Sequence, residues 1–206
     1  MIRNVVLAGV GGQGLITIGR IMGEALLSKG YNVLVSEVHG LSQRGGSVVI
    51  YLKYGKEKEI SPIVPEGYAE VEIALELIEA LRYSYLLSKE GIMLVNDFLL
   101  PPPGVKDAPG KDELLSAIED LGMKYFLIDA SSIAESIGNP LLANVVLMGV
   151  ASGMGLLPLS LENLEIGVKK VLREKFWDVN IKAVKLGFKE GQKIAPAKAD
   201  TKGNNS

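Results

Sequence analysis

The chain has 206 residues, of which 48% are hydrophobic, and its 22 basic and 24 acidic residues give a formal net charge of -2. This length and apolar content suit one α/β domain with a sizeable core, and the balanced charge implies no general attraction to nucleic acid or to anionic lipid. The chain has no cysteine, which excludes disulfides, thiolate-bound zinc and cysteine-held iron–sulfur clusters within it.

Two features of the sequence bear on location. Met1 leads straight into a strand-like segment without the basic and apolar regions of a signal peptide, so we expect a cytoplasmic protein. The stretch 136–161 carries no charge, but prolines, asparagines and glycines interrupt it. The remaining apolar run is shorter than the roughly 20 residues that cross a bilayer. We therefore predict a buried core helix there and no membrane span.

The first predicted elements are a strand, a glycine-rich turn and a helix. The β-branched run Arg3–Ala8 predicts the strand, and Leu15–Leu27 has the apolar spacing of a helix. Glycines between them allow a tight turn and close approach of a ligand, and the helix N-terminus offers unpaired N–H groups to an anion. The same glycines also suit a turn that serves only packing. The candidate binding residues of this turn are Gly9, Gly11, Gly12, Gln13 and Gly14.

A second strand is predicted at Tyr31–Ser36, and Glu37 follows it directly. Glu37 lies roughly 20 residues beyond the glycines, where a dinucleotide-binding fold places the acid that binds the ribose hydroxyls. The segment after Glu37 is not the small turn and helix with which such a fold continues, so the acid also fits a hydrogen-bond network within the following loop. A freestanding dinucleotide-binding protein of Rossmann type is therefore an alternative function.

The segment from Val35 to Ser47 is the part of the chain that packing explains least. It contains the only histidine and crowds polar and charged side chains between three glycines, directly before the next predicted strand, Ser47–Tyr54. Open α/β sheets place their sites on loops at such positions. The candidate site residues of this loop are Glu37, His39, Ser42, Gln43, Arg44, Gly45 and Gly46.

The middle of the chain continues the alternation of strands and helices. Residues 69–87 fit either one long helix or a strand at Val71–Leu75 followed by a helix at Leu77–Leu87. We predict the strand and the helix, because βαβ alternation requires a strand here. The further predicted elements are an extended segment at Ser61–Gly67, strands at Ile92–Asn96 and Lys124–Asp129, a loop at Pro101–Gly104, a helix at Lys111–Leu121 and a helical segment ending near Ile137.

Three helices are predicted after that segment. Asn144–Leu157 is apolar nearly all round, and its Gly149 and Gly153 share one face where another helix could approach closely. Asn144 itself lies among apolar neighbours and requires a hydrogen-bond partner or a ligand, so it is also a candidate site residue. Ser160 caps the next helix, and an apolar stripe from Trp177 onward marks the last one.

These elements predict a Rossmann-like open sheet of the α/β class, with flanking helices and a helical C-terminal part. Residues 1–194 are predicted to form one domain, because the length of the chain suits one α/β domain or one such domain with a helical extension. Residues 195–206 have few apolar side chains and are predicted to be a disordered tail.

The two glycine-containing motifs in combination resemble the gamma-type subunit or domain of 2-oxoacid:ferredoxin oxidoreductases. They are Gly-x-Gly-Gly-Gln-Gly after the first strand and Val-Ser-Glu-Val-His-Gly-Leu-Ser-Gln-Arg-Gly-Gly-Ser after the second. Within this family, His39, Ser42 and Gln43 replace residues typical of the pyruvate enzymes, which indicates the indolepyruvate, or aryl-pyruvate, type. The tail after Ile194 and the segment 101–110 match nothing in the family. Further matches cover most of the chain, among them Ser61-Pro62, Leu77–Tyr83, Asn139-Pro140, Asn144–Gly149 and Leu157-Pro158.

The resemblance implies a subunit of an enzyme that oxidises a 2-oxoacid to its acyl-CoA, releases carbon dioxide and reduces ferredoxin. It implies that thiamine diphosphate and the iron–sulfur clusters belong to a large alpha subunit, with coenzyme A as a substrate and no metal in this chain. The absence of cysteine agrees with that division, because a chain without thiolates lacks the usual ligands of such clusters. The expected partners are the alpha subunit and, through the complex, ferredoxin, with a homodimer as an option for the isolated chain.

The resemblance also implies a wall of a composite active site. We expect Glu37, His39, Gln43 and Arg44 to face the alpha subunit near the thiamine or the acyl-CoA. Arg44 suits a carboxylate or a phosphate through its fork of donors. His39 suits a donor or proton relay, or else a hydrogen-bonded residue that only fixes the loop. The glycine turn is a candidate cradle for part of coenzyme A.

Overall fold

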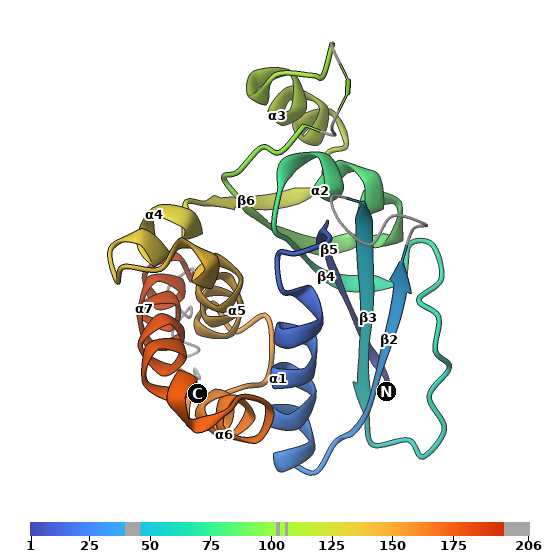
Figure 1. Ribbon diagram of the computed structural model, residues 1–206. Coiled ribbons are helices and arrows are strands. Elements are labelled where there is room, and N and C mark those ends of the chain that lie inside the picture. Colours follow the sequence, from blue (N-terminus) through green and yellow to red (C-terminus); the bar gives the residue numbers. More distant parts are fainter. Residues whose placement is uncertain (40–45, 102–103, 106, 196–206) are drawn as a thin grey trace, which may run out of the picture.

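The protein, described here by a computed structural model, is built on one six-stranded sheet (Figure 1). The structure describes residues 1–39, 46–101, 104–105 and 107–195. The strands are β1 (Arg3–Val10), β2 (Asn32–His39), β3 (Ser47–Gly55), β4 (Ala69–Ala74), β5 (Leu87–Asn96) and β6 (Lys124–Ile128). The helices are α1 (Leu15–Ser28), α2 (Leu77–Tyr83), α3 (Lys111–Asp120), α4 (Ala130–Glu135), α5 (Ala143–Gly153), α6 (Leu161–Val171) and α7 (Trp177–Ile194).

The order of the strands across the sheet is β2-β3-β1-β4-β5-β6. Strands β1, β4, β5 and β6 are parallel neighbours, whereas β3 runs antiparallel to both β1 and β2. The strand that follows α1 is therefore separated from β1 by β3. The predicted strand–helix–strand opening exists, but its two strands are not neighbours, because the later strand β3 takes the place between them.

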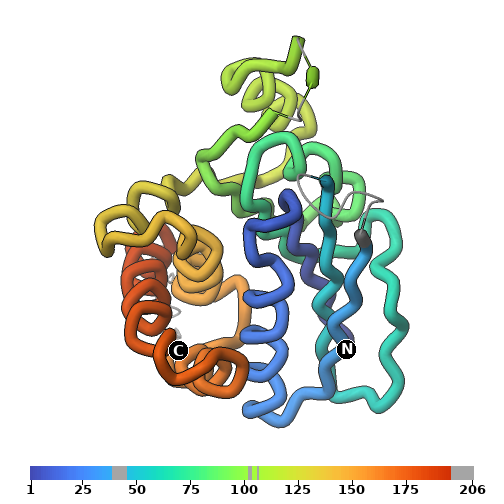
Figure 2. The backbone as a smooth tube through the Cα atoms, viewed as in Figure 1, coloured from blue at the N-terminus to red at the C-terminus, as the bar shows by residue number. Residues whose placement is uncertain are grey.

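The alternation of side chains along the strands divides the core into two layers. Leu7 of β1 and Ile50 of β3 pack with α1, α4, α5, α6 and α7 on one face. Val6 and Val49 pack with α2 and α3 on the other face. Both faces of the central strands are thus apolar, as expected for a sheet that helices cover on both sides. Figure 2 shows the end of β1 and the start of α1 at the same end of the sheet as α2 and α4.

Glycines allow α5 and α7 to lie with their backbones in contact. A Cβ atom added at Gly149 would lie 2.6 Å from the carbonyl oxygen of Val184, and one added at Gly153 would overlap the carbonyl oxygen of Phe188. On α7, Gly187 and Gly191 face the carbonyl oxygens of α5 in the same way. The predicted close approach of a second helix at the Gly149-x-x-x-Gly153 face is confirmed, and the second helix is α7.

The fold class predicted from the sequence is confirmed, but several element boundaries differ. Strand β2 continues to His39, so the start of the predicted loop is strand. The helix predicted at Leu77–Leu87 ends at Tyr83, and a 3-10 turn at Ser84–Leu86 leads into β5, which begins earlier than predicted. The helix predicted at Asn144–Leu157 ends at Gly153. The tail predicted to be disordered lies outside the described residues from 196 onward, and the loop at Pro101–Gly104 lies partly outside them. Within the part of the chain that is described, no helix is long and apolar enough to cross a membrane.

Glu72 is a buried acid in the middle of β4. It lies opposite Val6 of β1 and Met93 of β5, on the face of the sheet covered by α2 and α3. The residue is 1% exposed, and neither carboxyl oxygen has a hydrogen-bond partner among the described residues. Burial raises the pKa of Glu72 well above its usual value, because an unpaired charge is unfavourable in an apolar layer. The group is therefore held as a neutral carboxylic acid.

The Glu72→Gln variant should be more stable than the natural chain at neutral pH. The folded chain keeps a proton on Glu72 that the unfolded chain releases near the ordinary pKa of 4.5. As the pH rises from the unfolded pKa to the folded pKa, Glu72 therefore lowers the free energy of unfolding by about 1.4 kcal/mol per pH unit. Below the unfolded pKa the residue has no such effect. Urea unfolding from about pH 4 to about pH 8 should show the two chains diverging as the pH rises.

The matched control is Glu90→Gln, at an exposed carboxyl on the neighbouring strand β5. This variant should not show the divergence with pH. An equal stability of the Glu72→Gln variant and the natural chain at every pH would contradict a neutral buried carboxyl in β4.

Candidate functional site

A cavity of about 390 Å³ lies at the carboxyl ends of β1, β4 and β5. Ligands bind to open α/β sheets in this position, in the crevice beyond the ends of the parallel strands. The glycine turn forms one wall, and the segments around α4 and α5 form the opposite wall. The residues that line the cavity are Gly11, Gly12, Gln13, Leu75, Asn96, Phe98, Leu100, Ser131, Glu135, Pro140, Leu141, Ala143 and Asn144.

The glycine turn is closed by its own glutamine. The side-chain oxygen of Gln13 accepts a hydrogen bond of 2.7 Å from the backbone N–H of Val10, and the backbone N–H of Gln13 donates to the carbonyl of Val10 at 3.1 Å. Gly12 and Gly14 have φ angles of 104° and 76°, which side chains disfavour. Gln13 therefore shapes the turn, and the backbone of the turn faces the cavity.

The turn leads directly into α1, whose first residues have no side-chain cap. Gly14 stands at the N-cap position in a left-handed conformation and accepts the first helical hydrogen bond from Ile18 at 3.2 Å. The N–H groups of the first turn of α1 consequently keep their capacity to bind an acceptor. Together with the helix dipole, they favour an anionic or phosphate-bearing ligand beside the cavity.

Asn144 connects α5 to the glycine turn. Its side-chain nitrogen donates a 3.2 Å hydrogen bond to the carbonyl of Gly14, and its side-chain oxygen accepts from the N–H of Val145 at 2.7 Å. A Cβ atom at Gly14 would overlap the Asn144 nitrogen. The partner that the sequence required for Asn144 is therefore the turn itself, and Asn144 positions the turn while it lines the cavity.

Asn96 and Ser131 are site residues that the sequence analysis missed. Asn96 ends β5 and donates to the carbonyl of Leu75 at 3.3 Å and to the hydroxyl of Ser131 at 3.1 Å. Its oxygen accepts from the N–H of Ala130 at 3.1 Å, which fixes the start of α4. The signal that could have found them is their position: Asn96 is the last residue of one predicted strand and Ser131 lies two residues beyond the end of another, and the ends of parallel strands converge.

The hairpin formed by β2 and β3 reaches the glycine turn. The backbone N–H of Gly11 donates a 2.8 Å hydrogen bond to the carbonyl of Gly46, and Ser47 lies opposite Val10 in the sheet. The two glycine-containing motifs of the sequence are therefore in direct contact at Gly11 and Gly46. Ser42, Gln43, Arg44 and Gly45 lie outside the described residues.

A cluster on α2 fixes the β3 end of this hairpin. The hydroxyl of Ser47 donates to the carboxylate of Glu79 and is 2.8 Å from the hydroxyl of Tyr83. Arg82 pairs with Glu79 at 2.9 Å. Glu76 caps α2 by accepting from two backbone N–H groups, and burial raises its pKa while these hydrogen bonds oppose the rise. Helix α2 thus carries the buried acid Glu79, which holds Ser47 at the start of β3 in place.

Glu37 and His39 occupy strand positions, which corrects their assignment to a loop. Glu37 lies opposite Ile50 and His39 opposite Val48 on the edge strand β2. A Rossmann fold places the ribose-binding acid on the strand beside β1, but here β3 intervenes. Glu37 is therefore displaced from β1 by two strand spacings, roughly 10 Å. The dinucleotide interpretation of Glu37 loses its geometric basis.

The chemistry of the lining favours binding over catalysis. Among the described lining residues, Glu135 alone is ionisable, and it is exposed. Gln13, Asn96 and Asn144 are engaged in hydrogen bonds that hold the walls. No group of acids or histidines within the described residues is suited to a metal ion. A reaction at this cavity would need reactive groups beyond the described lining residues.

Comparison with known proteins identifies the family. Residues 4–190 match the family model of pyruvate ferredoxin/flavodoxin oxidoreductase, and the chain belongs to this family. The chain is 40% identical to the indolepyruvate oxidoreductase subunit IorB of Thermococcus kodakarensis, over 93% of this chain and 96% of that protein. It is 37% identical to the IorB subunit of Archaeoglobus fulgidus, over 91% of this chain and 94% of that protein. The gamma-type family predicted from the two motifs is confirmed.

Solved structures share the fold. The gamma subunit of a keto/oxoacid ferredoxin oxidoreductase from Geobacter sulfurreducens matches with a TM-score of 0.69 and 24% identity, covering 93% of this chain and 99% of that one. The 2-oxoglutarate:ferredoxin oxidoreductase of Magnetococcus marinus matches with a TM-score of 0.72 and 17% identity, covering 93% of this chain but 31% of that one. The same fold thus occurs as a separate chain and as part of a longer one.

Replacing Gly14 by alanine should destabilise the chain through two separable effects. The positive φ penalises any side chain, and the added Cβ overlaps the Asn144 amide. In an Asn144→Ala background, which itself loses about 1 kcal/mol with the hydrogen bond, the cost of Gly14→Ala should fall by about 1 kcal/mol. Urea unfolding of the four chains of this double-mutant cycle measures the difference.

Gly12→Ala is the matched control for this cycle. Gly12 has a positive φ but no atom within 4 Å of an added Cβ, so its cost should be the same in both backgrounds. Additive effects of Gly14→Ala and Asn144→Ala would contradict the contact between the turn and α5.

Proposed function

We propose that this chain is the smaller subunit of an indolepyruvate, or aryl-pyruvate, ferredoxin oxidoreductase, and that it completes the active site of a large alpha subunit. The reaction is the oxidative decarboxylation of a 2-oxoacid to its acyl-CoA, with release of carbon dioxide and reduction of ferredoxin. The observation that carries the proposal is the 34–40% identity to IorB subunits along nearly the whole chain. The amide side chains that line the cavity are already engaged in hydrogen bonds with its walls, which supports a composite site.

The division of cofactors follows from the donor groups available. Thiamine diphosphate supplies the electron sink for decarboxylation and iron–sulfur clusters carry the electrons. The chain has no cysteine with which to hold a cluster. We therefore assign the clusters to the alpha subunit, where ferredoxin would meet the complex. The family resemblance assigns thiamine diphosphate to the same subunit.

The glycine turn and its cavity suit part of coenzyme A. The volume of about 390 Å³ is within the range of small-molecule sites. The uncapped N-terminus of α1 offers N–H groups to a phosphate, and Phe98, Leu100 and Leu141 provide apolar surface for an uncharged segment. In this proposal Gly9, Gly11, Gly12 and Gly14 shape the cradle, and Gln13 and Asn144 hold it in place.

The hairpin supplies the groups that face the partner. We assign Arg44 to a carboxylate or phosphate of a substrate, Gln43 and Ser42 to hydrogen bonds with it, and His39 to donation or proton relay. Two hydrogen bonds support this assignment, one donated by Gly11 to Gly46 and one donated by Ser47 to Glu79, because they hold the start of β3 beside the glycine turn. Glu37, on the exposed edge strand, would contact the alpha subunit.

The first test is reconstitution. Co-expression with the candidate alpha subunit should give a stable complex on size exclusion, and anaerobic turnover of indolepyruvate, coenzyme A and ferredoxin should require both chains. Turnover by the alpha subunit alone at the full rate would contradict a composite site. The isolated chain run on the same column tests whether it forms a homodimer.

Within that complex, Arg44→Gln should raise the KM for coenzyme A or for the 2-oxoacid roughly tenfold, because a charge-assisted hydrogen bond is lost. Arg20→Gln, at an exposed arginine on α1, is the matched control and should leave both KM values unchanged. A KM unchanged for both substrates would remove Arg44 from the site.

His39→Ala should lower kcat on the order of a hundredfold if the imidazole relays a proton. A change in KM alone would indicate binding through its N–H group. Unchanged kcat and KM would leave His39 as a residue that only fixes the hairpin.

The dinucleotide alternative predicts a different result. If the chain were a freestanding dinucleotide-binding protein, NAD at about 1 mM would raise its melting temperature by several degrees through ligand linkage. We expect no such shift, because β3 separates Glu37 from the glycine turn. A shift that Glu37→Gln abolishes would favour the alternative.

A further inference from the structure

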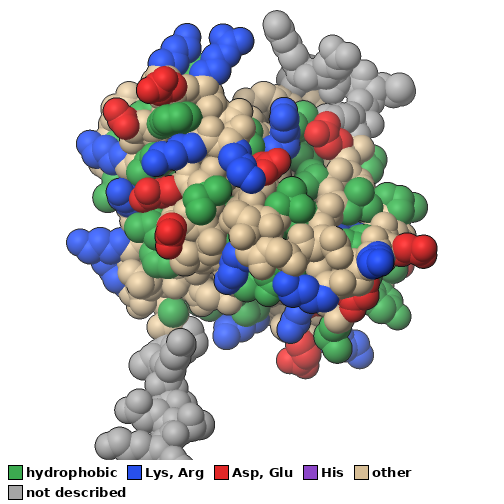
Figure 3. Space-filling view, turned by 90° about the horizontal axis from the view of Figure 1, so that it is seen from below, with side chains coloured by type: hydrophobic (Ala, Val, Ile, Leu, Met, Phe, Trp, Pro, Cys, Tyr) green, Lys and Arg blue, Asp and Glu red, His purple; other side chains and the backbone are tan. Residues whose placement is uncertain are grey.

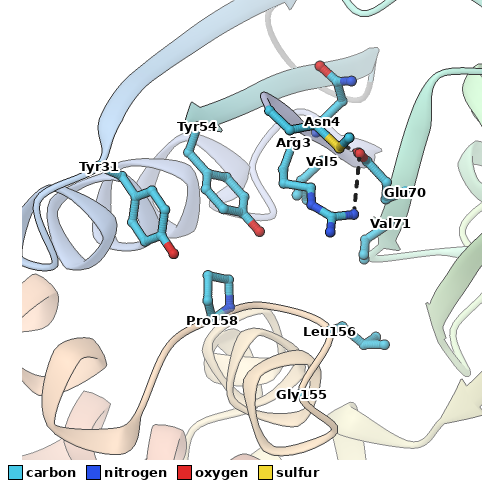
Figure 4. Close-up of a pocket in the computed structure, with 11 residues that line it drawn as sticks. Arg3, Asn4, Val5, Tyr31, Tyr54, Glu70, Val71, Gly155, Leu156 and Pro158 are labelled. Atoms are coloured by element: carbon cyan, nitrogen blue, oxygen red, sulfur yellow. Dashed lines mark hydrogen bonds and ion pairs between the residues drawn. The ribbon is translucent and has the colours of Figure 1, made fainter. Parts of the chain in front are cut away.

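A second cavity, of about 520 Å³, lies at the end of the sheet opposite the glycine turn (Figure 4). It lies between the beginning of β1 and the loop 154–160, which joins α5 to α6. None of its lining residues belongs to the cavity at the glycine turn. It is therefore a separate feature of the fold, and the function proposed above does not use it.

Two tyrosines form one wall of this cavity. The rings of Tyr31 and Tyr54 meet edge to face, with centroids 5.3 Å apart and an angle of 79° between their planes. The ammonium of Lys56 lies 4.4 Å from the centre of the Tyr31 ring and donates to the carbonyl of Gly30 at 2.7 Å. These contacts fix the rings in advance, so a ligand would meet an ordered aromatic surface.

The hydroxyl groups of both tyrosines point into the cavity. Neither makes a hydrogen bond within the described part of the chain. Burial raises the pKa of Tyr54 to about 12, so its hydroxyl stays protonated and able to donate at neutral pH. The wall therefore combines aromatic surface with two available donors.

Arg3 brings a positive group to the same cavity. Its guanidinium lies 3.7 Å from the carboxylate of Glu70, whose other oxygen accepts from the backbone N–H of Asn4 at 2.6 Å. A guanidinium has five N–H donors, and this long contact leaves most of them for a ligand. Glu70 thus orients Arg3 without occupying its donor fork.

The opposite wall is apolar and held in place. Leu156 and Pro158 lie across the cavity from the tyrosines, as Figure 4 shows, and Val5 and Val71 border it on the sheet. The ammonium of Lys29 donates a 2.6 Å hydrogen bond to the carbonyl of Pro158. This bond ties the loop 154–160 to the end of α1, which keeps the cavity open to a planar group.

The charges around the cavity favour an anion. Figure 3 views this end of the molecule and shows lysine and arginine side chains interspersed with acidic ones. Arg3 lines the cavity beside the carboxylate of Glu70, and Lys29 and Lys56 contact its lining residues, so the two lysines are positive charges beyond that pair. The amino group of Met1, which also borders the cavity, pairs with Glu57, so those two charges cancel.

We propose that this cavity binds an aromatic monocarboxylate. The ring of the ligand would lie between the tyrosine wall and Pro158, and its carboxylate would bind Arg3. The aromatic wall, the two phenol donors and the guanidinium converge on one space, and the apolar wall offers contact surface to a planar ring. The site lies on the other side of the domain from the glycine turn.

Naphthylacetate and its neutral amide, naphthylacetamide, are the probes, titrated into the full chain. Calorimetry should give a Kd on the order of 1 mM or tighter for naphthylacetate and weaker binding for the amide. Amide NMR shifts should change at Asn4, Tyr31, Val71 and Gly155, and not at Gly12 or Gly14.

Two variants separate the parts of the site. Arg3→Gln should weaken naphthylacetate binding at least about tenfold and leave naphthylacetamide binding unchanged. Tyr31→Leu should weaken both probes alike. Arg20→Gln removes an exposed arginine from α1 and should change neither.

Three results would each overturn the proposal. The first is that neither probe binds at a concentration of about ten times the expected Kd. The second is that the NMR shifts change at Gly12 and Gly14 instead of around Tyr31. The third is that the Arg3→Gln variant and the natural chain bind naphthylacetate with equal affinity. Because the test uses neither a partner subunit nor turnover, its failure leaves the proposed oxidoreductase function untouched.

Discussion

The antiparallel pairing of β3 between β1 and β2 is the constraint on which the candidate site depends. The register places Val10 opposite Ser47, so the chain leaving β1 and the chain entering β3 meet at the same edge of the sheet. The hydrogen bond from Gly11 to Gly46 continues that pairing beyond the strands. The start of β3 and the glycine turn, which are more than thirty residues apart in sequence, are thereby held side by side. If β2 paired directly with β1, the fold would have the geometry of a dinucleotide-binding domain and would lose this contact.

The second support of the site comes from the helical layer. Helix α5 packs against α7 through glycines on both helices, which brings the two backbones into contact. The same helix presents Asn144 to the carbonyl of Gly14. The position of the glycine turn is therefore set from both sides, by the hairpin and by α5. Helix α2 adds Glu79, which fixes Ser47 behind the hairpin. A turn held in this way is pre-organised for a ligand, and binding it costs little conformational entropy.

The two ends of the sheet offer different chemistry. At the carboxyl ends of the strands, the side-chain amides are engaged with the walls, and backbone N–H groups are what the cavity offers to a ligand. These groups suit an anionic or phosphate-bearing ligand. At the opposite end, phenol hydroxyls and a guanidinium face the cavity directly. Buried Glu72 lies between these two ends with Val6 and Met93 opposite it in the sheet, and this apolar environment raises the pKa of its carboxyl.

The sequence by itself determined the α/β class, the glycine turn between the first strand and helix, the close-packing face at Gly149 and Gly153, and the family. These features depend on local periodicity, on glycine conformation and on short motifs, which are all legible along the chain. It also showed that Asn144 required a hydrogen-bond partner or a ligand, but not which group that partner was. Only the tertiary structure decided that β3 lies between β1 and β2, that Glu37 and His39 belong to an edge strand, and that Asn96 and Ser131 meet at the cavity. The physical reason is that strand order and the convergence of strand ends are set by pairing and burial between distant segments, and these leave no signal in local spacing.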